Sequence, residues 1–415
     1  MMKTTGACTS VPLVSCDVAT LIKPRPPHDI RPAKYLTNPI LDPVGNNKQI
    51  YASAVVKRGK MQVISFTTTH TVCYNGLNNY IIERSVFMTR WGIIGTGKIA
   101  RTFATALQGL DNSVTAAVAS RTLENAQSFA EEFGFEKAYG SYEELARDES
   151  IDIVYIATPM HKHYEDTLLC LENGRNVLCE KSIALNTKQA EEMFARANEK
   201  GLFLMEAMWM KMRPAYLKVK QWIKEGRIGD IRYIKADFNN FIPFDKNDRL
   251  FKPECGGGAL LDLGVYPITF AVALMGEPSS IETHAHIGSC GIDLSNSVTL
   301  LYPNGAFAST TSGFEVQNRN NAVIAGDKGS ITMGDWFFCS PECTLYDAES
   351  RQIEDRLFPP EINGYEYEIR EAEKCLAEGL KTSRAVPPEE TLTIMRIMDE
   401  CRKTWGLRFP QEFNS

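Results

Sequence analysis

From Arg90 onward, short apolar runs alternate with longer amphipathic segments. The short runs predict strands, and apolar residues that recur every three to four positions predict helices. Strands separated by helices pair in parallel, so this part of the chain predicts a Rossmann-type, doubly wound parallel sheet. The predicted strands are residues 91–94, 114–119, 151–157, 177–179 and 202–205. The predicted helices are residues 99–108, 123–133, 142–147, 163–172 and 187–199.

After about Ala207 the pattern changes to longer strand-like runs joined by hairpin turns such as residues 303–305, PNG. This part predicts a C-terminal α+β domain with an open, mostly antiparallel sheet. Its predicted strands are residues 231–239, 281–287, 297–302, 306–312, 322–325 and 329–333, and its predicted helices are residues 214–225, 364–378 and 389–404. We therefore expect a dinucleotide-binding domain at residues 88–207 and a substrate-binding and oligomerisation domain at residues 208–415.

The first 87 residues differ from the rest of the chain. They hold ten Lys/Arg against four Asp/Glu, whereas the remaining residues carry an acidic excess. Seven prolines fall between Pro12 and Pro43, where they disfavour helices and central strands. We expect residues 1–87 to be a poorly ordered or non-native extension, with the working protein starting near Met88.

Composition is that of an ordinary globular protein. A chain of 415 residues that is 44% hydrophobic and 23% charged is long enough for two domains. The net charge of −6 argues against a general nucleic-acid surface, and we find no apolar run long enough to span a bilayer. The eleven cysteines lack paired spacing. They indicate free thiols in a reducing, cytoplasmic setting and no metal site.

Residues 90–100, RWGIIGTGKIA, join an apolar strand to an amphipathic helix through a glycine turn. This is the G-x-G-x-x-A form of a dinucleotide-binding turn. Gly95 is expected to make the tight turn, Gly97 to let the backbone approach a pyrophosphate, and Ala100 to let the helix lie close to the strand. The helix N-terminus offers unpaired N–H groups and a positive dipole end to the phosphates.

The end of the second strand indicates which dinucleotide binds. An acidic residue there would hold the ribose 2′-hydroxyl of NAD, but this strand ends in Ser120 and Arg121. A guanidinium can donate paired hydrogen bonds to a 2′-phosphate, so the sequence favours NADP, with NAD still possible. The alternative is a solvated arginine at the start of a helix.

Other polar residues follow the later strands. His161 and His163 could form a metal pair, but helix capping and substrate contact are favoured over metal binding. Lys181 ends a predicted strand, where it is a candidate catalytic cation, and a salt-bridged surface lysine is the alternative. His284 and His286 fall on one face of a predicted strand and are interpreted as packing residues.

Residues 256–267, GGGALLDLGVYP, form the second informative segment. The glycines let a loop approach a ligand, and the following helix places Asp262 and Tyr266 at i and i+4, on one face. Tyr266 could there exchange the proton of a substrate hydroxyl. A core tyrosine beside a capping aspartate is the alternative.

Together these motifs resemble the glucose–fructose oxidoreductase and inositol dehydrogenase family over about residues 89–415. Within it the chain is most similar to the dimeric dihydrodiol dehydrogenases, which also act as NADP-dependent D-xylose dehydrogenases. The motifs that carry the resemblance are GTGKIA at 95–100, ATP at 157–159 with His163, EK at 180–181, EAMW at 206–209 and DLGVYP at 262–267. Ser182 stands where the family usually has a proline, which is expected to loosen the loop that holds Lys181.

The resemblance implies hydride transfer between a sugar or trans-dihydrodiol and NADP in a homodimer. It implies Tyr266 as general base, Lys181 as its electrostatic support if the ammonium touches the phenol, and Asp262 as the residue that orients substrate hydroxyls or the lysine. Trp209 would stack on a sugar or aromatic face, and His163 and Arg213 would also contact substrate. The residues expected to bind the cofactor are Gly95, Thr96, Gly97, Lys98, Ile99, Ser120, Arg121, Ala157, Thr158, Pro159, His163, Glu180 and Lys181.

Two other functions are compatible with the sequence. One is a reductase of a different carbonyl substrate. The other is a dinucleotide-binding regulator that has lost catalysis, against which the presence of both Lys181 and Tyr266 argues.

Overall fold

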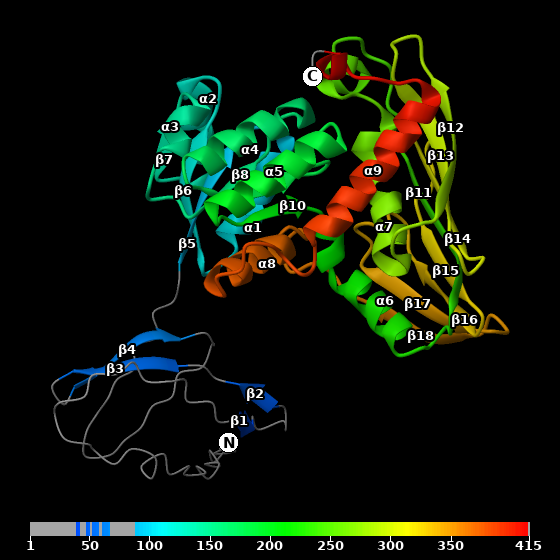
Figure 1. The fold of residues 1–415 in the computed structure, drawn as a ribbon, viewed down its shortest axis with the longest axis horizontal. Coiled ribbons are helices and arrows are strands. Elements are labelled where there is room, and N and C mark those ends of the chain that lie inside the picture. Colours follow the sequence, from blue (N-terminus) through cyan, green and yellow to red (C-terminus); the bar gives the residue numbers. More distant parts are fainter. Residues whose placement is uncertain (1–38, 42–46, 50–51, 58–59, 67–87, 414–415) are drawn as a thin grey trace, which may run out of the picture. The chain divides into compact units, whose positions relative to one another are not determined.

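A computed structural model describes residues 39–41, 47–49, 52–57, 60–66 and 88–413 of the chain (Figure 1). The chain divides into two units, Met1–Glu83 and Arg84–Ser415. In the described part of the first unit, β1 (Pro39–Leu41) pairs antiparallel with β2 (Asn47–Gln49), and β3 (Ala52–Lys57) with β4 (Lys60–Phe66). The rest of residues 1–87 lies outside the described residues, so the interpretation of this segment as an extension stays a prediction.

Within residues 88–413, six strands form a parallel sheet in the order β10-β9-β8-β5-β6-β7. The strands β6 and β7 lie on one side of β5, and the later strands β8, β9 and β10 lie on its other side. The strand order therefore reverses at the boundary between β5 and β8. Ligands of open α/β sheets bind at such a point, beyond the carboxyl ends of the strands. The strands are β5 (Thr89–Ile94), β6 (Ser113–Ala119), β7 (Lys137–Tyr139), β8 (Ile153–Ile156), β9 (Asn176–Glu180) and β10 (Leu204–Ala207).

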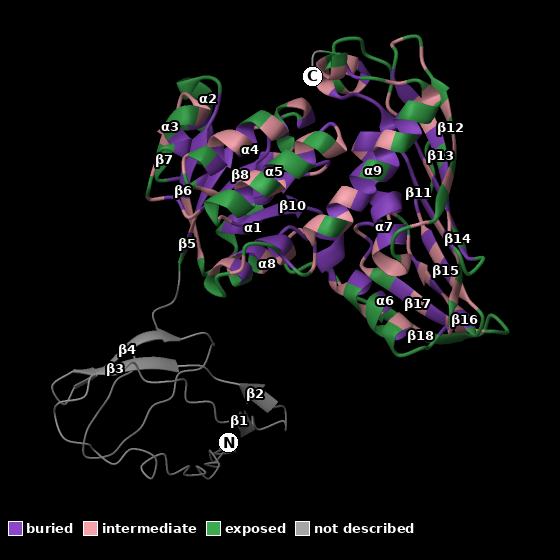
Figure 2. Ribbon diagram, viewed as in Figure 1, coloured by how far each residue is buried: buried purple, intermediate pink, exposed green. Residues whose placement is uncertain are grey.

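The helices of this part follow the predicted pattern closely, and two of them, α2 and α4, have the predicted bounds. Strand β8 inside the sheet and strand β10 at its edge are both buried throughout (Figure 2), as expected for a sheet covered on both faces. The short strand β7 was not predicted. The helices are α1 (Lys98–Gln108), α2 (Leu123–Phe133), α3 (Tyr142–Ala146), α4 (His163–Glu172) and α5 (Thr187–Lys200).

A second sheet of eight strands, again within residues 88–413, has the order β12-β13-β14-β11-β15-β16-β17-β18. Its neighbours are antiparallel except for the pair β11 and β14. The predicted α/β fold class, a Rossmann sheet followed by a mostly antiparallel one, is thereby confirmed. The strands are β11 (Ile231–Asn239), β12 (Ser280–Ile287), β13 (Asp293–Leu301), β14 (Phe307–Gly313), β15 (Ala322–Gly326), β16 (Gly329–Met333), β17 (Glu342–Asp347) and β18 (Gln352–Leu357).

Four helices of residues 208–413 connect this sheet to the rest of the chain. Helix α7 packs on β11 and β14, α9 packs on β12, and α6 packs on β17. The last two helices also reach the nucleotide-binding part, because α8 contacts α1 and α9 contacts α5. The predicted boundary at residue 207 stays a prediction. The helices are α6 (Pro214–Lys224), α7 (Val265–Met275), α8 (Glu366–Ala377) and α9 (Pro388–Trp405).

The expectation that no apolar run is long enough to cross a membrane is corrected by the helical stretch Pro253–Met275. By length and composition this stretch could span a bilayer, but 78% of its most apolar window is buried inside the protein. A buried core helix passes the same test, and the stretch includes α7, which packs on the second sheet.

The interpretation of His284 and His286 as packing residues is wrong. Both lie on one face of β12, as predicted, but that face is exposed. Nδ1 of His286 lies 3.0 Å from the carboxylate of Glu315. Apolar and polar residues alternate along β12, and the apolar ones lie on the opposite face of the strand.

Candidate active site

The glycine turn lies between the end of β5 and the start of α1. Gly95 has a φ of +103°, and a Cβ at this position would lie 2.8 Å from the carbonyl oxygen of Ala157, so glycine is required. Gly97 caps α1, and a Cβ there would meet nothing within 4 Å. Among the described residues, no side chain caps α1 and its first turn contains no acid. This arrangement fits a dinucleotide, since open space and free N–H groups meet where a pyrophosphate would bind.

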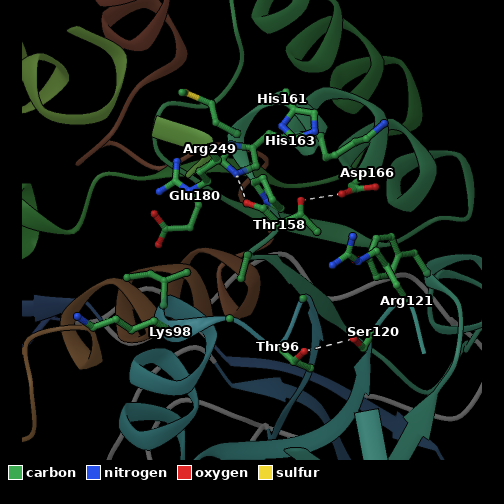
Figure 3. A pocket seen from close by; sticks show the side chains of 18 of the residues that line it. Thr96, Lys98, Ser120, Arg121, Thr158, His161, His163, Asp166, Glu180 and Arg249 are labelled. Carbon is green, nitrogen blue, oxygen red and sulfur yellow. Dashed lines mark hydrogen bonds between the residues drawn. The ribbon is translucent and has the colours of Figure 1, made fainter. Parts of the chain in front are cut away.

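Ser120 and Arg121 lie at the end of the neighbouring strand β6 (Figure 3). The hydroxyl oxygens of Thr96 and Ser120 are 3.2 Å apart, which ties the glycine turn to this strand end. Arg121 is exposed and forms no ion pair within residues 88–413. Its guanidinium is therefore free to bind an anionic group of the cofactor.

A cavity of about 950 Å³ begins at these strand ends and runs to Lys181. Figure 3 shows Ser120, Arg121 and Asp166 at one end, and Glu180 and Arg249 at the other. The cavity brings together all the residues that the sequence analysis assigned to the cofactor. The residues that line it are Gly95, Thr96, Gly97, Lys98, Ile99, Thr102, Ser120, Arg121, Asn125, Tyr142, Ala157, Thr158, Pro159, Met160, His161, Lys162, His163, Glu165, Asp166, Glu180, Lys181, Arg249 and Asp262.

The side chains of Lys181 and Asp262 meet at the second end of the cavity. Nζ of Lys181 donates a 2.8 Å hydrogen bond to the backbone carbonyl of Asp262 and lies 3.7 Å from its carboxylate. Arg249 lies 3.6 Å from the same carboxylate. Burial raises the pKa of Asp262, but the charges of Lys181 and Arg249 outweigh burial and hold this pKa below its usual value.

Arg249 and Asp166 line the cavity but were not predicted from the sequence. Arg249 comes from a loop after β11 that has no recognisable motif, so no local signal marks it. Asp166 lies in the first turn of α4, and its carboxylate accepts a 2.7 Å hydrogen bond from the hydroxyl of Thr158. Burial raises the pKa of Asp166 to about 6.

Tyr266 is buried among other aromatic side chains. It is not among the described residues that line the cavity. Its hydroxyl accepts a 2.8 Å hydrogen bond from the indole N–H of Trp209. Nζ of Lys181 lies over its ring, 5.1 Å from the ring centroid. Burial, and next the negative charge of Glu180, raise the pKa of Tyr266 well above 10, whereas the bond from Trp209 lowers it. The ammonium of Lys181, which was expected to support the phenolate if it touched the phenol, thus lies over the ring of Tyr266.

Asp262 and Tyr266 do not lie on one regular α-helix as predicted. Residues Leu260–Gly264 form a π-helical turn, and α7 starts directly after it. Single π turns are frequent at functional sites. The carboxylate of Asp293 accepts a 2.7 Å hydrogen bond from the N–H of Leu260 and so holds the start of this turn.

Neither Trp209 nor Arg213 is among the described residues that line the cavity, so their contact with substrate stays a prediction. The ring of Trp209 stacks on Tyr365 with centroids 4.8 Å apart. The guanidinium of Arg213 lies 5.1 Å from the Trp209 ring centroid and donates to the carbonyl of Cys339. Trp209 thus contacts Tyr266 directly, and Arg213 contacts Trp209.

His163 is also held by the protein rather than free for a substrate. Its ring is buried, with Nδ1 2.8 Å from the carbonyl oxygen of Ser182 and Nε2 2.9 Å from that of Thr158. Burial lowers the pKa of His163 to about 4, so the ring is neutral near pH 7. His163 thus joins two loops of the site, and because it also lines the cavity, its contact with substrate stays a prediction.

Glu180 lies at the end of β9, almost completely buried. Its carboxylate accepts a hydrogen bond from the hydroxyl of Tyr155, and burial raises its pKa above the usual value. Within the described part of the chain, no group of three or more His, Cys, Asp or Glu side chains is arranged to hold a metal ion.

Comparison with known proteins identifies relatives of both halves of the chain. Residues 89–208 match the oxidoreductase family with an NAD-binding Rossmann fold, and residues 216–332 match the GFO/IDH/MocA C-terminal domain. The trans-1,2-dihydrobenzene-1,2-diol dehydrogenase of Mus musculus is 37% identical over 340 residues, which cover 78% of this chain and 98% of the relative. The enzyme of the same name from Homo sapiens is 35% identical over 333 residues, with the same coverage.

Solved structures also resemble this chain. A 3-ketoreductase from Actinomadura kijaniata, in complex with NADP and TDP-benzene, has a TM-score of 0.67 and 30% identity, and covers 76% of this chain and 97% of its own. A levoglucosan dehydrogenase in complex with NADH and levoglucosan has a TM-score of 0.69 at 22% identity, covering 77% of this chain and 97% of its own. The second similarity concerns the fold alone.

Proposed function

The chain belongs to the GFO/IDH/MocA family of NAD(P)-binding oxidoreductases, and from this premise we propose that it transfers a hydride between a sugar or trans-dihydrodiol and NADP. The observation that carries the proposal is one cavity that joins a dinucleotide-binding glycine turn to the Lys181–Asp262 pair. The relatives named for dihydrodiol oxidation and sugar ketoreduction support this substrate class.

The cofactor is assigned to the end of the cavity at the glycine turn. The N-terminus of α1, with Gly95 and Gly97, would hold the pyrophosphate. Ser120 and Arg121 would hold a 2′-phosphate, which is why we propose NADP rather than NAD. When bound, the nicotinamide supplies the acceptor or donor of the hydride.

Tyr266 is proposed as the group that exchanges a proton with substrate. Its raised pKa keeps the phenol protonated near neutral pH, which suits proton donation to a carbonyl oxygen during reduction. Oxidation requires the phenolate as base, so the groups around the phenol have to lower this raised pKa toward neutral pH.

Two neighbours favour the phenolate of Tyr266. The Lys181 ammonium lies 5.1 Å from the ring centroid, and its positive charge favours the phenolate. The hydrogen bond donated by Trp209 also lowers the pKa of Tyr266. Asp262, held by Lys181 and Arg249, is proposed to accept hydrogen bonds from the hydroxyls of the substrate.

The same proposal includes a cytoplasmic homodimer whose subunits meet on the second sheet. A regulator that binds dinucleotide without catalysis, and a reductase of another carbonyl compound, remain the alternatives. The presence of Lys181 and Asp262 together in the cavity favours an enzyme.

The test is NADPH formation with D-xylose, with a trans-dihydrodiol, and with a wider panel of sugars and polyols. We expect turnover by the wild type, and we expect Lys181→Met to abolish it while leaving the Kd for NADP within about threefold. Lys224→Met, at an exposed position of α6, is the matched control and keeps full activity. Tight NADP binding with no turnover of any compound would instead identify a regulator.

A further inference from the structure

Lys181 and Ser182 reach across to two adjacent carbonyl groups of the π turn. Nζ of Lys181 donates to the carbonyl of Asp262 over 2.8 Å, and the hydroxyl of Ser182 donates to the carbonyl of Leu261 over 2.9 Å. Consecutive side chains after β9 thus bind consecutive backbone carbonyls in the reverse order. Ser182 is fully buried, so water does not compete for its hydrogen bond.

We propose that Ser182 is a positioning residue that fixes the π turn against the loop after β9, and thereby sets the distance between Lys181 and Asp262. The proposal rests on the proposed function, because it assigns Ser182 to the same site. Ser182 does not line the cavity among the described residues, so it acts through its neighbours rather than on substrate.

The rest of the Ser182 peptide is already held by the nucleotide-binding part. Its carbonyl oxygen lies 2.8 Å from Nδ1 of His163. The next N–H, that of Ile183, donates over 3.1 Å to the buried carboxylate of Glu206, at the end of β10. These two bonds fix the loop after β9 against the parallel sheet. The hydrogen bond from the Ser182 hydroxyl then holds the π turn against this fixed loop.

The bond from Lys181 alone is a weaker constraint on the turn. A lysine has a long flexible stem, and holding its ammonium in one place costs conformational entropy. Serine has one rotatable side-chain bond, and its short side chain ties the Leu261 carbonyl closely to the loop backbone. With both bonds present, the turn is held at two adjacent carbonyl groups, which restricts rotation as well as translation.

Ser182 was expected to loosen the loop that holds Lys181, and the structure corrects this expectation. A proline, which the family resemblance suggests at this position, has no hydroxyl and would leave the Leu261 carbonyl without this donor. The serine was expected to loosen the loop, but the structure shows it bonded across to the turn. In this chain the constraint comes from a hydrogen bond between segments that are far apart in sequence.

The test compares Ser182→Ala with the matched control Ser383→Ala in the full-length protein. Ser383 is equally buried and donates to Glu371, away from the cavity. For Ser182→Ala we expect kcat to fall about tenfold, as for the loss of one buried hydrogen bond, with the KM for NADP within about twofold. Ser182→Thr keeps the hydroxyl and should recover most of kcat.

A second measurement does not depend on turnover. Amide hydrogen exchange in peptides covering residues 260–266 should be faster in Ser182→Ala than in the wild type and unchanged in Ser383→Ala. Equal exchange in the wild type and Ser182→Ala overturns the proposal, and so does an equal fall in kcat for both alanine variants. If the wild type turns over no sugar or diol, the proposed function fails while the exchange result still decides the role of Ser182. If Ser182→Thr does not fold, the two alanine variants decide alone.

Discussion

The indole N–H of Trp209 donates a 2.8 Å hydrogen bond to the hydroxyl of Tyr266, and both side chains are buried. Tyr266 thus receives its hydrogen bond from behind, while the ammonium of Lys181 lies over its ring. A donor to a phenol oxygen stabilises the phenolate more than the phenol. Trp209 therefore opposes the burial that raises the pKa of Tyr266.

Replacing Trp209 by Phe removes this donor and keeps an aromatic ring. The pKa of Tyr266 should rise further, so the pH at which oxidation reaches half its maximum kcat should move up by about one unit, with about a tenfold loss of kcat at pH 7. The measurement is a pH profile of kcat with a substrate from the panel. Trp405→Phe is the control, because the Trp405 N–H is buried without a partner in the described structure. An unmoved profile for Trp209→Phe would rule out this role.

The two glycines of the turn should respond differently to substitution. Gly97→Val adds atoms into open space beside the cavity, so we expect an unchanged Tm but NADP binding weakened at least tenfold. Gly95→Ala places a methyl group 2.8 Å from the Ala157 carbonyl at a φ of +103°, which should lower the stability by about 1–3 kcal/mol. Thermal denaturation and NADP titration measure both effects. A Gly97→Val protein that binds NADP as tightly as the wild type would contradict the assignment of the pyrophosphate to this turn.

Arg121→Ala tests the choice of cofactor. The loss of a charge-assisted hydrogen bond to a 2′-phosphate costs about 1.5–3 kcal/mol, so the Kd for NADP should rise about tenfold to a hundredfold. The Kd for NAD should stay within about twofold, since NAD lacks that phosphate. Binding of both dinucleotides is measured by titration, with the exposed Arg147→Ala as control. Equal weakening for both dinucleotides would show that Arg121 does not read the 2′-phosphate.

Glu206 should make the stability depend on pH. Burial raises the pKa of Glu206 to about 7, against 4.5 for an ordinary glutamate. The folded protein then binds more protons than the unfolded chain between these values, so its stability falls as the pH rises through this window. The shift corresponds to about 3 kcal/mol, an order-of-magnitude figure.

Glu206→Gln should remove this part of the pH dependence, because the amide accepts from Ile183 but does not ionise. Denaturant unfolding at pH 5 and at pH 8 measures the change in the free energy of unfolding between the two pH values. Glu191→Gln, at an exposed position of α5, is the control. We expect the wild type and the control to lose more stability between the two pH values than Glu206→Gln does. Parallel losses in all three proteins would refute the raised pKa.

Much of the nucleotide-binding half could be predicted because its signals are local. The apolar run before Gly95, the two glycines and the amphipathic segment after them lie within a dozen residues. Caps are equally local: Thr122 accepts from the N–H of Asn125, and α2 then begins at the predicted residue. Strand β18 was missed because it is largely exposed and so lacks the apolar alternation that marks a strand. Strand β17 was missed as well, although its burial alternates.

Local patterns in the sequence were enough to predict the kind of protein. A glycine turn, a basic residue after the second predicted strand and a lysine after a later strand predict a dinucleotide-binding oxidoreductase, since each depends on a few adjacent residues. How the reacting groups are held depends on the tertiary structure. It turned Trp209 inward onto Tyr266, brought Arg249 to Asp262, and tied Ser182 to Leu261. The bonds from Trp209 and Ser182 join residues 57 and 79 positions apart. Contacts at such separations form only when two sheets and their connecting helices pack together, and no local pattern of residues encodes them.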